Sequence, residues 1–273
     1  MRYSEKVLDL KKNCNQCNAF CCIALYFSKM DGFPYDKLAG ESCRFLNLKN
    51  RCKIYKNLKT LGHKGCKAYD CFGGGPYVTK KIIQEKSWKV VECTKKIFRI
   101  FLVVVDLNEF LWYLLDTLKY SYKDTLRSRV ESMIEKIQML KKQSVDHLLS
   151  VDLSKLRSEV GSLLDEASKN IRLLLIDSDT VLIPEDPFYF TGKDMRKENL
   201  RGQCLKGRCL IKSNLQGCDL SYLDVLGVDF RDSNIKNANL KNTLFLDQRQ
   251  VNSAIGDKFT ILPKNITMPD HWV

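Results

Sequence analysis

Residues 213–242 read SNLQG CDLSY LDVLG VDFRD SNIKN ANLKN when the chain is written in groups of five. An apolar residue occupies the centre of every group, and the same period extends back to Met195 and forward to Phe245. A period of five fits neither the 3.6-residue repeat of an α-helix nor the two-residue repeat of a strand. The stretch therefore predicts a repeat architecture. The eleven centres are Met195, Leu200, Leu205, Leu210, Leu215, Leu220, Val225, Phe230, Ile235, Leu240 and Phe245.

The residues that precede each centre also follow a pattern. The residue directly before the centre is often Asp or Asn, and the residue two before it is small in most of the later groups. The phrases Ser-Asn-Leu-Gln-Gly, Cys-Asp-Leu-Ser-Tyr and Ala-Asn-Leu-Lys-Asn resemble the Ala-Asp/Asn-Leu motif of the pentapeptide-repeat family. The resemblance implies a right-handed quadrilateral β-helix in which four groups make one coil. It also implies inward positions for the small residues Ser213, Cys218, Ser233, Ala238 and Thr243.

Both ends of this repeat domain, assigned to residues 185–273, need separate treatment because stacked coils must be covered at their ends. Glu198, Gln203 and Arg208 stand where the family has small inward residues, so we expect a distorted first coil. Residues 256–263 and 269–272 resemble the C-terminal cap of the family. Within the repeat, Cys204 and Cys209 fall at outward positions of adjacent sides and Cys218 falls inward, so metal binding by these three is not expected.

Residues 94–184 contain no cysteine and show helical periodicity. Apolar residues recur every three or four positions from Leu153 to Leu174, and Asp152 is placed to cap that helix. A second stripe consists of Val130, Ile134, Ile137 and Leu140. We expect two or three helices that pack within the chain, and a partner-binding seam is the alternative.

The N-terminal residues 1–93 form a cysteine-rich region, since nine of the twelve cysteines lie between Cys14 and Cys93. Clustered cysteines in a reducing compartment usually hold a metal or carry out redox chemistry. Eight thiols exceed the need of one four-ligand site, which leaves room for a second site or for structural cysteines; reduced buried thiols are the alternative. We interpret residues 73–75, a run of glycines, as a flexible turn. The candidate metal ligands are Cys14, Cys17, Cys21, Cys22, Cys43, Cys52, Cys66 and Cys71.

The order of these phrases resembles a small bacterial domain described as a zinc- or iron-chelating cluster, with the motif Cys-x2-Cys-x2-Cys-Cys. Residues 43–46 and 52–55 match its Cys-Pro-Phe-Leu and Cys-x-Ile-Tyr phrases, although one extra residue precedes Cys21 and no proline follows Cys43. The resemblance implies a metal-binding module, and the ligands stay open. Zinc would take four thiolates, as would an iron–sulfur cluster. Adjacent Cys21 and Cys22 crowd a small ion, which a larger cluster tolerates better, so the metal is undecided between the two.

Composition limits the choice of partner. The formal net charge of +13 is compatible with nucleic-acid binding, but lysine-rich composition alone gives the same excess. The chain has no early apolar block, and residues 97–115 are interrupted by charged residues, so we expect a cytoplasmic protein without a membrane span. Between Lys193 and Val251, eleven Lys and Arg face seven Asp and Glu, a net charge of +4. That balance disfavours the acidic DNA mimicry by which members of this family protect topoisomerases.

Together these patterns predict a mixed, multi-domain chain with a cysteine-rich metal module, a helical middle region and a C-terminal β-helix. The three histidines, His63, His147 and His271, are scattered, and no nucleophile–base motif is visible, so an enzyme is disfavoured. We expect an interaction protein that binds zinc or an iron–sulfur cluster and presents its β-helix to a protein partner. An iron–sulfur redox sensor or enzyme is the first alternative, and a topoisomerase-protecting factor is the second.

Overall fold

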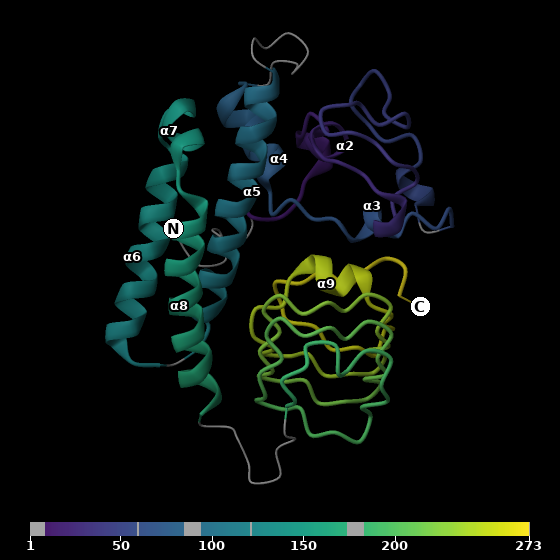
Figure 1. Ribbon diagram of the computed structural model, residues 1–273, viewed down its shortest axis with the longest axis vertical. Coiled ribbons are helices and arrows are strands. Elements are labelled where there is room, and N and C mark those ends of the chain that lie inside the picture. The colour runs from purple at the N-terminus through teal and green to yellow at the C-terminus, as the bar shows by residue number, and fades with distance from the viewer. Residues whose placement is uncertain (1–8, 59, 85–93, 121, 174–182, 273) are drawn as a thin grey trace. The chain divides into compact units, whose positions relative to one another are not determined.

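The computed structural model describes residues 9–58, 60–84, 94–120, 122–173 and 183–272 (Figure 1). The chain divides into two compact units. The first comprises Met1–Cys66, Asp70–Leu115 and Thr125–Leu163, and the second comprises Lys67–Tyr69, Asp116–Asp124 and Leu164–Val273. The first unit therefore holds the eight candidate cysteines together with most of the long helices, and the second holds the repeat. The expected boundary between residues 93 and 94 stays a prediction, because residue 93 lies outside the described part.

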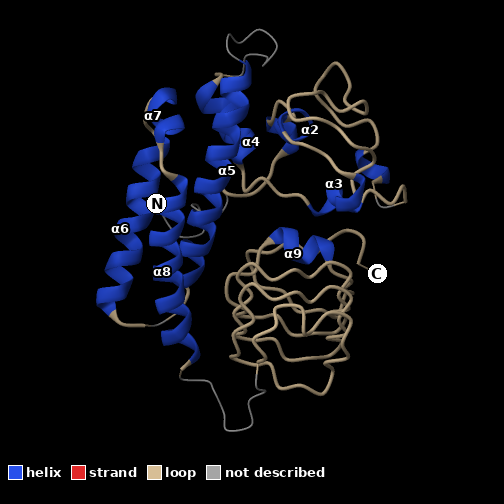
Figure 2. Cartoon of the chain, in the orientation of Figure 1, coloured by secondary structure: helices blue, strands red, loops and turns tan. Residues whose placement is uncertain are grey.

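The cysteine-rich part of the first unit consists of short helical turns joined by loops (Figure 2). Two isolated antiparallel bridges, Phe27 with Lys37 and Leu46 with Cys52, hold these loops together. Phe20, Ile23 and Phe72 are completely or almost completely buried and form its core. The short elements are η1 (Cys14–Gln16), α2 (Phe20–Ala24), η2 (Lys29–Asp31), η3 (Tyr55–Asn57), α3 (Lys64–Ala68), α4 (Gly74–Tyr77) and η4 (Val78–Ile82).

The helical region contains α5 (Thr94–Thr117), α6 (Asp124–Lys141), α7 (Val145–Ser150) and α8 (Leu153–Arg172). Of the stripe predicted on α6, Val130, Ile134 and Ile137 are buried and Leu140 is half-buried. The expected cap of α8 is also confirmed, since the Lys155 backbone N–H donates to Asp152 Oδ1 at 2.9 Å. Leu174 lies outside the described residues. Among the helices that the structure describes, none combines the length and the apolar character needed to cross a bilayer.

Within the first unit, the cysteine-rich loops pack directly on α5. The Phe20 and Phe101 rings stack with centroids 5.5 Å apart. The Asn108 side chain, which is fully buried, donates to the Phe72 carbonyl at 2.7 Å. Gly74 lies so close to Val105 that a Cβ would be 2.7 Å from the Val105 side chain. These contacts give the cysteine-rich loops an apolar support that they could not build from their own residues.

The repeat in the second unit forms coils of twenty residues, which is four groups of five. Parallel bridges join positions twenty residues apart, for example Asn214 with Asn234 and Asp219 with Asn239. The backbone N–H of Leu215 donates to the Asn234 carbonyl at 2.8 Å, and that of Leu220 donates to the Asn239 carbonyl at 2.9 Å. The bridges are isolated, and no continuous strand forms in the described residues (Figure 2). The coil agrees with the β-helix that the repeat implies.

The interior of the coils confirms the predicted register. All eleven group centres are buried, and none exposes more than 2% of its surface. Of the small residues predicted to point inwards, Ser213, Ser233 and Ala238 expose 1% or less. In the first coil Gln203 is buried, whereas Glu198 is exposed and Arg208 is half-buried, so that coil lacks the regular small inward residues.

The C-terminal end of the repeat is covered by a helix and by the closing residues. The helix α9 (Gln248–Ser253) begins with a capping box in which Asp247 and Gln250 bond reciprocally. Ile255 and Ile261 then add two more bridges to the last coil. Trp272 is buried against Gly256, and its indole N–H donates to the Ala254 carbonyl at 3.4 Å. The predicted cap is therefore present, and α9 adds to it.

One side of the coils is covered by other residues of the second unit. Ser168, on the C-terminal half of α8, donates its hydroxyl to the buried Asp224 carboxylate. Arg172 donates to the Ser168 hydroxyl at 2.9 Å and to the Gly202 carbonyl at 3.2 Å. Tyr120 donates to the Asn242 carbonyl at 3.0 Å. The side that carries Asp224 is therefore occupied within the chain itself.

Candidate metal centre

All eight candidate ligands lie in the first unit, four of them on short helical elements and four on the loops between them. Cys14 is in η1, Cys21 and Cys22 are in α2, and Cys66 is in α3. Local signals in the sequence set these turns: Asn13 caps η1 through a bond from the Asn15 N–H, and Ala19 adopts φ = 59° before α2 begins. The eight cysteines differ in solvent exposure: Cys14 is exposed, Cys43 and Cys71 are buried, and the other five are half-buried.

Cys21 and Cys22 direct their thiols towards the same region. Their sulfur atoms lie 4.0 Å apart. In a tetrahedral site with Zn–S bonds of about 2.3 Å, two thiolates lie about 3.8 Å apart, so this spacing suits a metal centre. Adjacency in the sequence therefore does not keep the two thiols apart.

Gly75 marks the contact between the two ends of the cysteine-rich region. A Cβ on Gly75 would lie 2.5 Å from Cys17 Sγ and 3.9 Å from Cys71 Sγ, so both sulfurs approach the bare backbone here. The interpretation of residues 73–75 as a turn holds for Gly73, with φ = 72°, but not for Gly74 and Gly75, which begin α4. Gly74 and Gly75 are buried in the first turn of α4, and the absence of side chains allows Val105 and Cys17 to come close. This requirement comes from residues distant in sequence, which the glycine run alone does not reveal.

Cys43 and Cys52 lie on a bent segment that returns to α2. The Cys43 N–H donates to the Cys22 carbonyl at 2.9 Å, and Lys53 N–H donates to the Phe45 carbonyl at 2.8 Å. Next to Cys52, the Arg51 guanidinium donates to the Cys17 carbonyl at 3.1 Å and to the Asn15 carbonyl at 2.7 Å. Backbone and side-chain bonds thus bring cysteines from separate loops into one region.

Burial dominates the protonation of these thiols. It raises the pKa of Cys17 to about 11 and that of Cys66 to about 12, and it also raises the pKa of Cys71. The hydrogen bond with Cys22, together with burial, raises the pKa of Cys21. Without a metal these thiols hold their protons at neutral pH, so a metal ion would displace protons as it binds.

Electrostatic interactions identify Cys21 as the common neighbour of the group. Its thiol interacts with those of Cys14, Cys17, Cys52, Cys66 and Cys71. Among the residues that the structure describes, however, no three His, Cys, Asp or Glu side chains stand in an arrangement that would hold a metal ion. Thiolates are soft donors of the kind that zinc and iron–sulfur clusters take.

Lys37 is a residue of this region that the sequence did not single out. Its ammonium is buried and donates to the carbonyls of Ile23, Leu25, Leu38 and Glu41 at 2.5 to 3.2 Å. It also interacts with the thiols of Cys43, Cys22 and Cys21. Burial lowers the pKa of this ammonium. No short motif in the sequence signals this buried cation.

The remaining sequence candidates lie elsewhere. Cys93 is outside the described residues. His63 is half-buried, with its ring 6.1 Å from the Phe45 ring. In the second unit Cys204 and Cys209 join adjacent sides of the coil, through bridges to Asp224 and Asp229, and Cys218 is buried. Cys209, expected at an outward position, is also buried, with 8% of its surface exposed.

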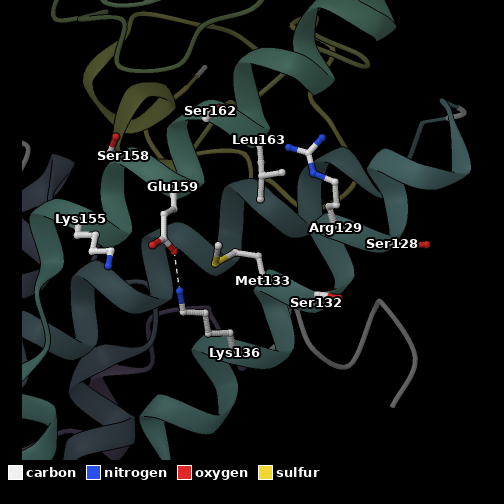
Figure 3. Close-up of a pocket in the computed structure, with 10 residues that line it drawn as sticks. All are labelled: Ser128, Arg129, Ser132, Met133, Lys136, Lys155, Ser158, Glu159, Ser162 and Leu163. Atoms are coloured by element: carbon white, nitrogen blue, oxygen red, sulfur yellow. Dashed lines mark hydrogen bonds and ion pairs between the residues drawn. The ribbon is translucent and has the colours of Figure 1, made fainter.

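The first unit also contains an open pocket of 720 Å³ between α6 and α8 (Figure 3). Lys136 and Glu159 pair across it at 2.6 Å. Polar side chains alternate with Met133 and Leu163 in its lining, which includes no cysteine or histidine, so it does not belong to the thiol region. The lining residues are Ser128, Arg129, Ser132, Met133, Lys136, Lys155, Ser158, Glu159, Ser162 and Leu163.

Comparison with known proteins gives two matches. The family model for pentapeptide repeats matches residues 209–245 with eight copies. The uncharacterized protein YybG of Bacillus subtilis (strain 168) is 42% identical over 273 residues, a match that covers 97% of this chain and 95% of YybG. No solved structure matches the chain.

Proposed function

The chain belongs to the family of pentapeptide-repeat proteins that includes YybG of Bacillus subtilis, and we propose that it is a metal-binding interaction protein without enzymatic activity. In this proposal the cysteine-rich loops fold around zinc or an iron–sulfur cluster. The repeat, as a right-handed quadrilateral β-helix, offers a rigid surface to a protein partner.

The observation that carries the metal-binding part is the position of Cys21. Five other thiols, from Cys14 to Cys71, interact with it, and a sixth, Cys22, lies 4.0 Å away. Buried thiols that only fill a core do not need to lie near one another, because each packs as a separate small apolar group. A metal would also supply the folding free energy that these loops lack, since they contain only short helical turns.

Two sides of the coil support the partner-binding part. Asn234 donates to Asn214 at 3.0 Å on one side, and Asn239 donates to Asp219 at 3.1 Å on the next. At their C-terminal ends Ile255, Phe259 and Ile261 are exposed, Phe259 by 63% of its surface. These apolar side chains next to the polar ladders are the part of the coil to which we assign the partner.

The first experiment measures metal and acid-labile sulfide, with a visible absorption spectrum, on protein purified without oxygen. Stoichiometric zinc in a colourless protein would assign a structural role to the metal. Iron with equal sulfide and a brown colour would assign an iron–sulfur cluster and would raise the redox-sensor alternative. A Cys21→Ser variant should lose metal, whereas Cys218→Ser, inside the coil, should keep it. Wild-type protein without metal, or Cys21→Ser with unchanged metal, would refute the metal-binding proposal.

A further inference from the structure

The residues on either side of each group centre have different roles in the coil. The residue before the centre holds the backbone: in eight groups its side-chain oxygen accepts the N–H of the residue after the centre, at 3.0 to 3.3 Å. Asp and Asn make this bond alike, as Asp219 and Asn239 show. The residue after the centre contributes only its N–H, so this bond places no requirement on its side chain.

The charged side chains directly after the centres are nevertheless all basic. Of the eleven such positions, six carry Lys or Arg and none carries Asp or Glu. Three of the six have a carboxylate partner within the second unit, and these pairs are Arg196 with Asp194, Lys206 with Asp165, and Arg231 with Asp229. The basic charge of these three is therefore compensated within the chain.

The other three basic residues follow groups in which Asn, not Asp, stands before the centre. These groups begin Asn199-Leu200-Arg201, Asn234-Ile235-Lys236 and Asn239-Leu240-Lys241. The neutral amide holds the backbone and leaves no carboxylate beside the cation. All three cations are exposed, and none of them forms an ion pair within the residues that the structure describes.

These three cations lie on the two sides of the coil that we assign to the partner. Arg201 and Lys241 share one side two coils apart, which corresponds to about 10 Å at the usual spacing of paired strands. Lys236 lies on the adjacent side, in the group before Lys241. The same two sides end in the exposed residues Ile255 and Ile261, which the last two parallel bridges join to them. Positive charge and apolar surface therefore follow one another along the axis of the coil.

Continuing from the proposed function, we propose that these two sides bind an acidic segment of another protein. Its carboxylates pair with Arg201, Lys236 and Lys241, and its apolar side chains cover Ile255 and Ile261. The ion pairs select the partner and fix its register, because opposite charges across an interface steer association and disfavour wrong partners. The two isoleucines give the contact an apolar part that leaves water on binding.

The same two sides disfavour a nucleic acid as the partner. Asp194 and Asp219 are exposed on them and repel a phosphate backbone. A polypeptide can place neutral residues opposite these carboxylates, whereas a nucleic acid carries a charged phosphate at every nucleotide. A phosphate backbone also offers no apolar cover for Ile255 and Ile261. Charge and apolar surface together therefore favour an acidic protein.

Fluorescence anisotropy of the full chain with a short labelled peptide of alternating Glu and Leu tests the proposal. Wild-type protein should bind the peptide, and the affinity should fall as NaCl is added, because salt screens exposed ion pairs. The triple variant Arg201→Gln, Lys236→Gln, Lys241→Gln should bind at least about tenfold more weakly. Gln216 already occupies an equivalent position, so the coil accepts this side chain, and circular dichroism should show an unchanged fold.

The matched control is the triple variant Lys95→Gln, Lys123→Gln, Lys142→Gln. It removes the same charge from exposed residues outside the repeat and should keep the wild-type affinity. Equal weakening in both triple variants would mean that net charge alone attracts the peptide, and the proposal would be overturned. Wild-type protein that does not bind the peptide would overturn it as well.

Other occupants of the two sides give different results. Duplex DNA that binds more tightly than the peptide, with binding lost in the repeat variant, would assign the two sides to a nucleic acid and overturn the proposal. Self-association in sedimentation velocity that the repeat variant abolishes would assign them to a second copy of the chain, with the same consequence.

Two further outcomes separate this inference from the proposed function. If Ile255→Ser abolishes peptide binding while the repeat triple variant binds normally, the partner surface is apolar in character. The proposed function then stands, and the acidic partner is wrong. Protein that binds the peptide through the three cations but contains no metal would contradict the metal-binding proposal and leave this inference intact.

Discussion

The carboxylate of Asp116 accepts a hydrogen bond from the backbone N–H of Phe245 at 2.9 Å. This bond takes the place of the bond between coils that the repeat itself cannot supply at Phe245. Other group centres donate this N–H to a carbonyl on the following coil, as Val225 donates to Leu244 at 3.1 Å. Phe245 is the last group centre and is fully buried. Without Asp116, its backbone N–H would be buried without this acceptor. Asp116 is itself buried and pairs with Lys119. The solenoid is thus completed by a residue from a helix far away in the sequence.

Replacing Asp116 by alanine should destabilise the second unit by about 1–3 kcal/mol, because a buried N–H loses its acceptor. Asp116→Asn keeps an acceptor oxygen at the same place and should lose less. Denaturant unfolding of both variants measures the difference. Equal losses would show that the ion pair with Lys119, rather than the bond to Phe245, carries the contribution of Asp116.

Asp224 gives a prediction for the pH dependence of stability. Burial raises the pKa of its carboxyl, and this effect outweighs the opposing bonds from Ser168 and Leu226. A carboxyl with a raised folded-state pKa contributes stability that is fully present below the unfolded pKa of about 3.9. That contribution is lost as the pH rises through the folded pKa. Asp224→Asn should therefore match or exceed the wild-type melting temperature at pH 7, and its advantage should shrink as the solution becomes acidic.

The control for this prediction is Asp219→Asn, on the neighbouring exposed side of the coil. Asparagine already occupies the equivalent position at Asn214, Asn234 and Asn239, so the amide fits the backbone there. Asp219→Asn should change stability little at either pH. A lower melting temperature for Asp224→Asn at pH 7 would mean that the attraction of Arg172 for the Asp224 carboxylate outweighs its burial.

The corners of the coils provide a third test. The last residue of successive groups has positive φ, whether it is glycine, as at Gly217 with φ = 73°, or another residue, as at Lys212 with φ = 58°. The Lys212 side chain is exposed, and the residue contributes to the coil through its backbone N–H, which donates to the Arg231 carbonyl at 3.0 Å. Lys212→Gly should stabilise the second unit by about 0.5–1 kcal/mol, since left-handed backbone strains a residue with a Cβ.

The matched change in the next group is Gly217→Ala. No atom lies within 4 Å of the added Cβ, so only the backbone conformation opposes it. We expect a loss of about 1–2 kcal/mol. Thermal unfolding of both variants tests whether Lys212→Gly raises the melting temperature and Gly217→Ala lowers it. A destabilised Lys212→Gly protein would mean that the flexibility of glycine in the unfolded chain exceeds the strain relieved in the coil.

These corners also show what the sequence reveals and what it hides. The eleven buried centres follow from the period of five alone, because each coil imposes the same environment on every group. Gly202, Gly207, Gly217 and Gly227 stand at the last position of their groups, and such glycines are a local sequence signal for the positive φ of the corners. The helix α9 likewise has a local signal in its capping box at Asp247 and Gln250.

The cysteine-rich region is different, because its arrangement depends on contacts between distant residues. The spacing of the cysteines indicates a metal module, yet nothing near Lys37 in the sequence predicts an ammonium bound to four carbonyls. Asp116 is hidden for the same reason, since its acceptor role is defined by Phe245. Periodic signals are thus readable from the chain, whereas single long-range contacts are not.

The close approach of Cys17 to Gly75 yields a prediction about metal affinity. An alanine Cβ at Gly75 would lie 2.5 Å from Cys17 Sγ, well inside the sum of the two atomic radii. Cys17 would have to move, and its sulfur would no longer lie beside that of Cys71. If the thiols bind a metal as proposed, we expect Gly75→Ala to weaken that binding at least tenfold, a change of about 1.4 kcal/mol in binding free energy.

Gly161→Ala is the matched control, because it lies on α8 and has no atom within 4 Å of the added Cβ. It should leave metal binding unchanged and stabilise its helix by about 0.5–1 kcal/mol. Competition with a chelator measures metal affinity in both variants, and Gly75→Ala should release its metal at a lower chelator concentration than the wild type. Unchanged release would show that Cys17 is not a ligand, because a displaced ligand cannot leave the affinity of its site unaltered.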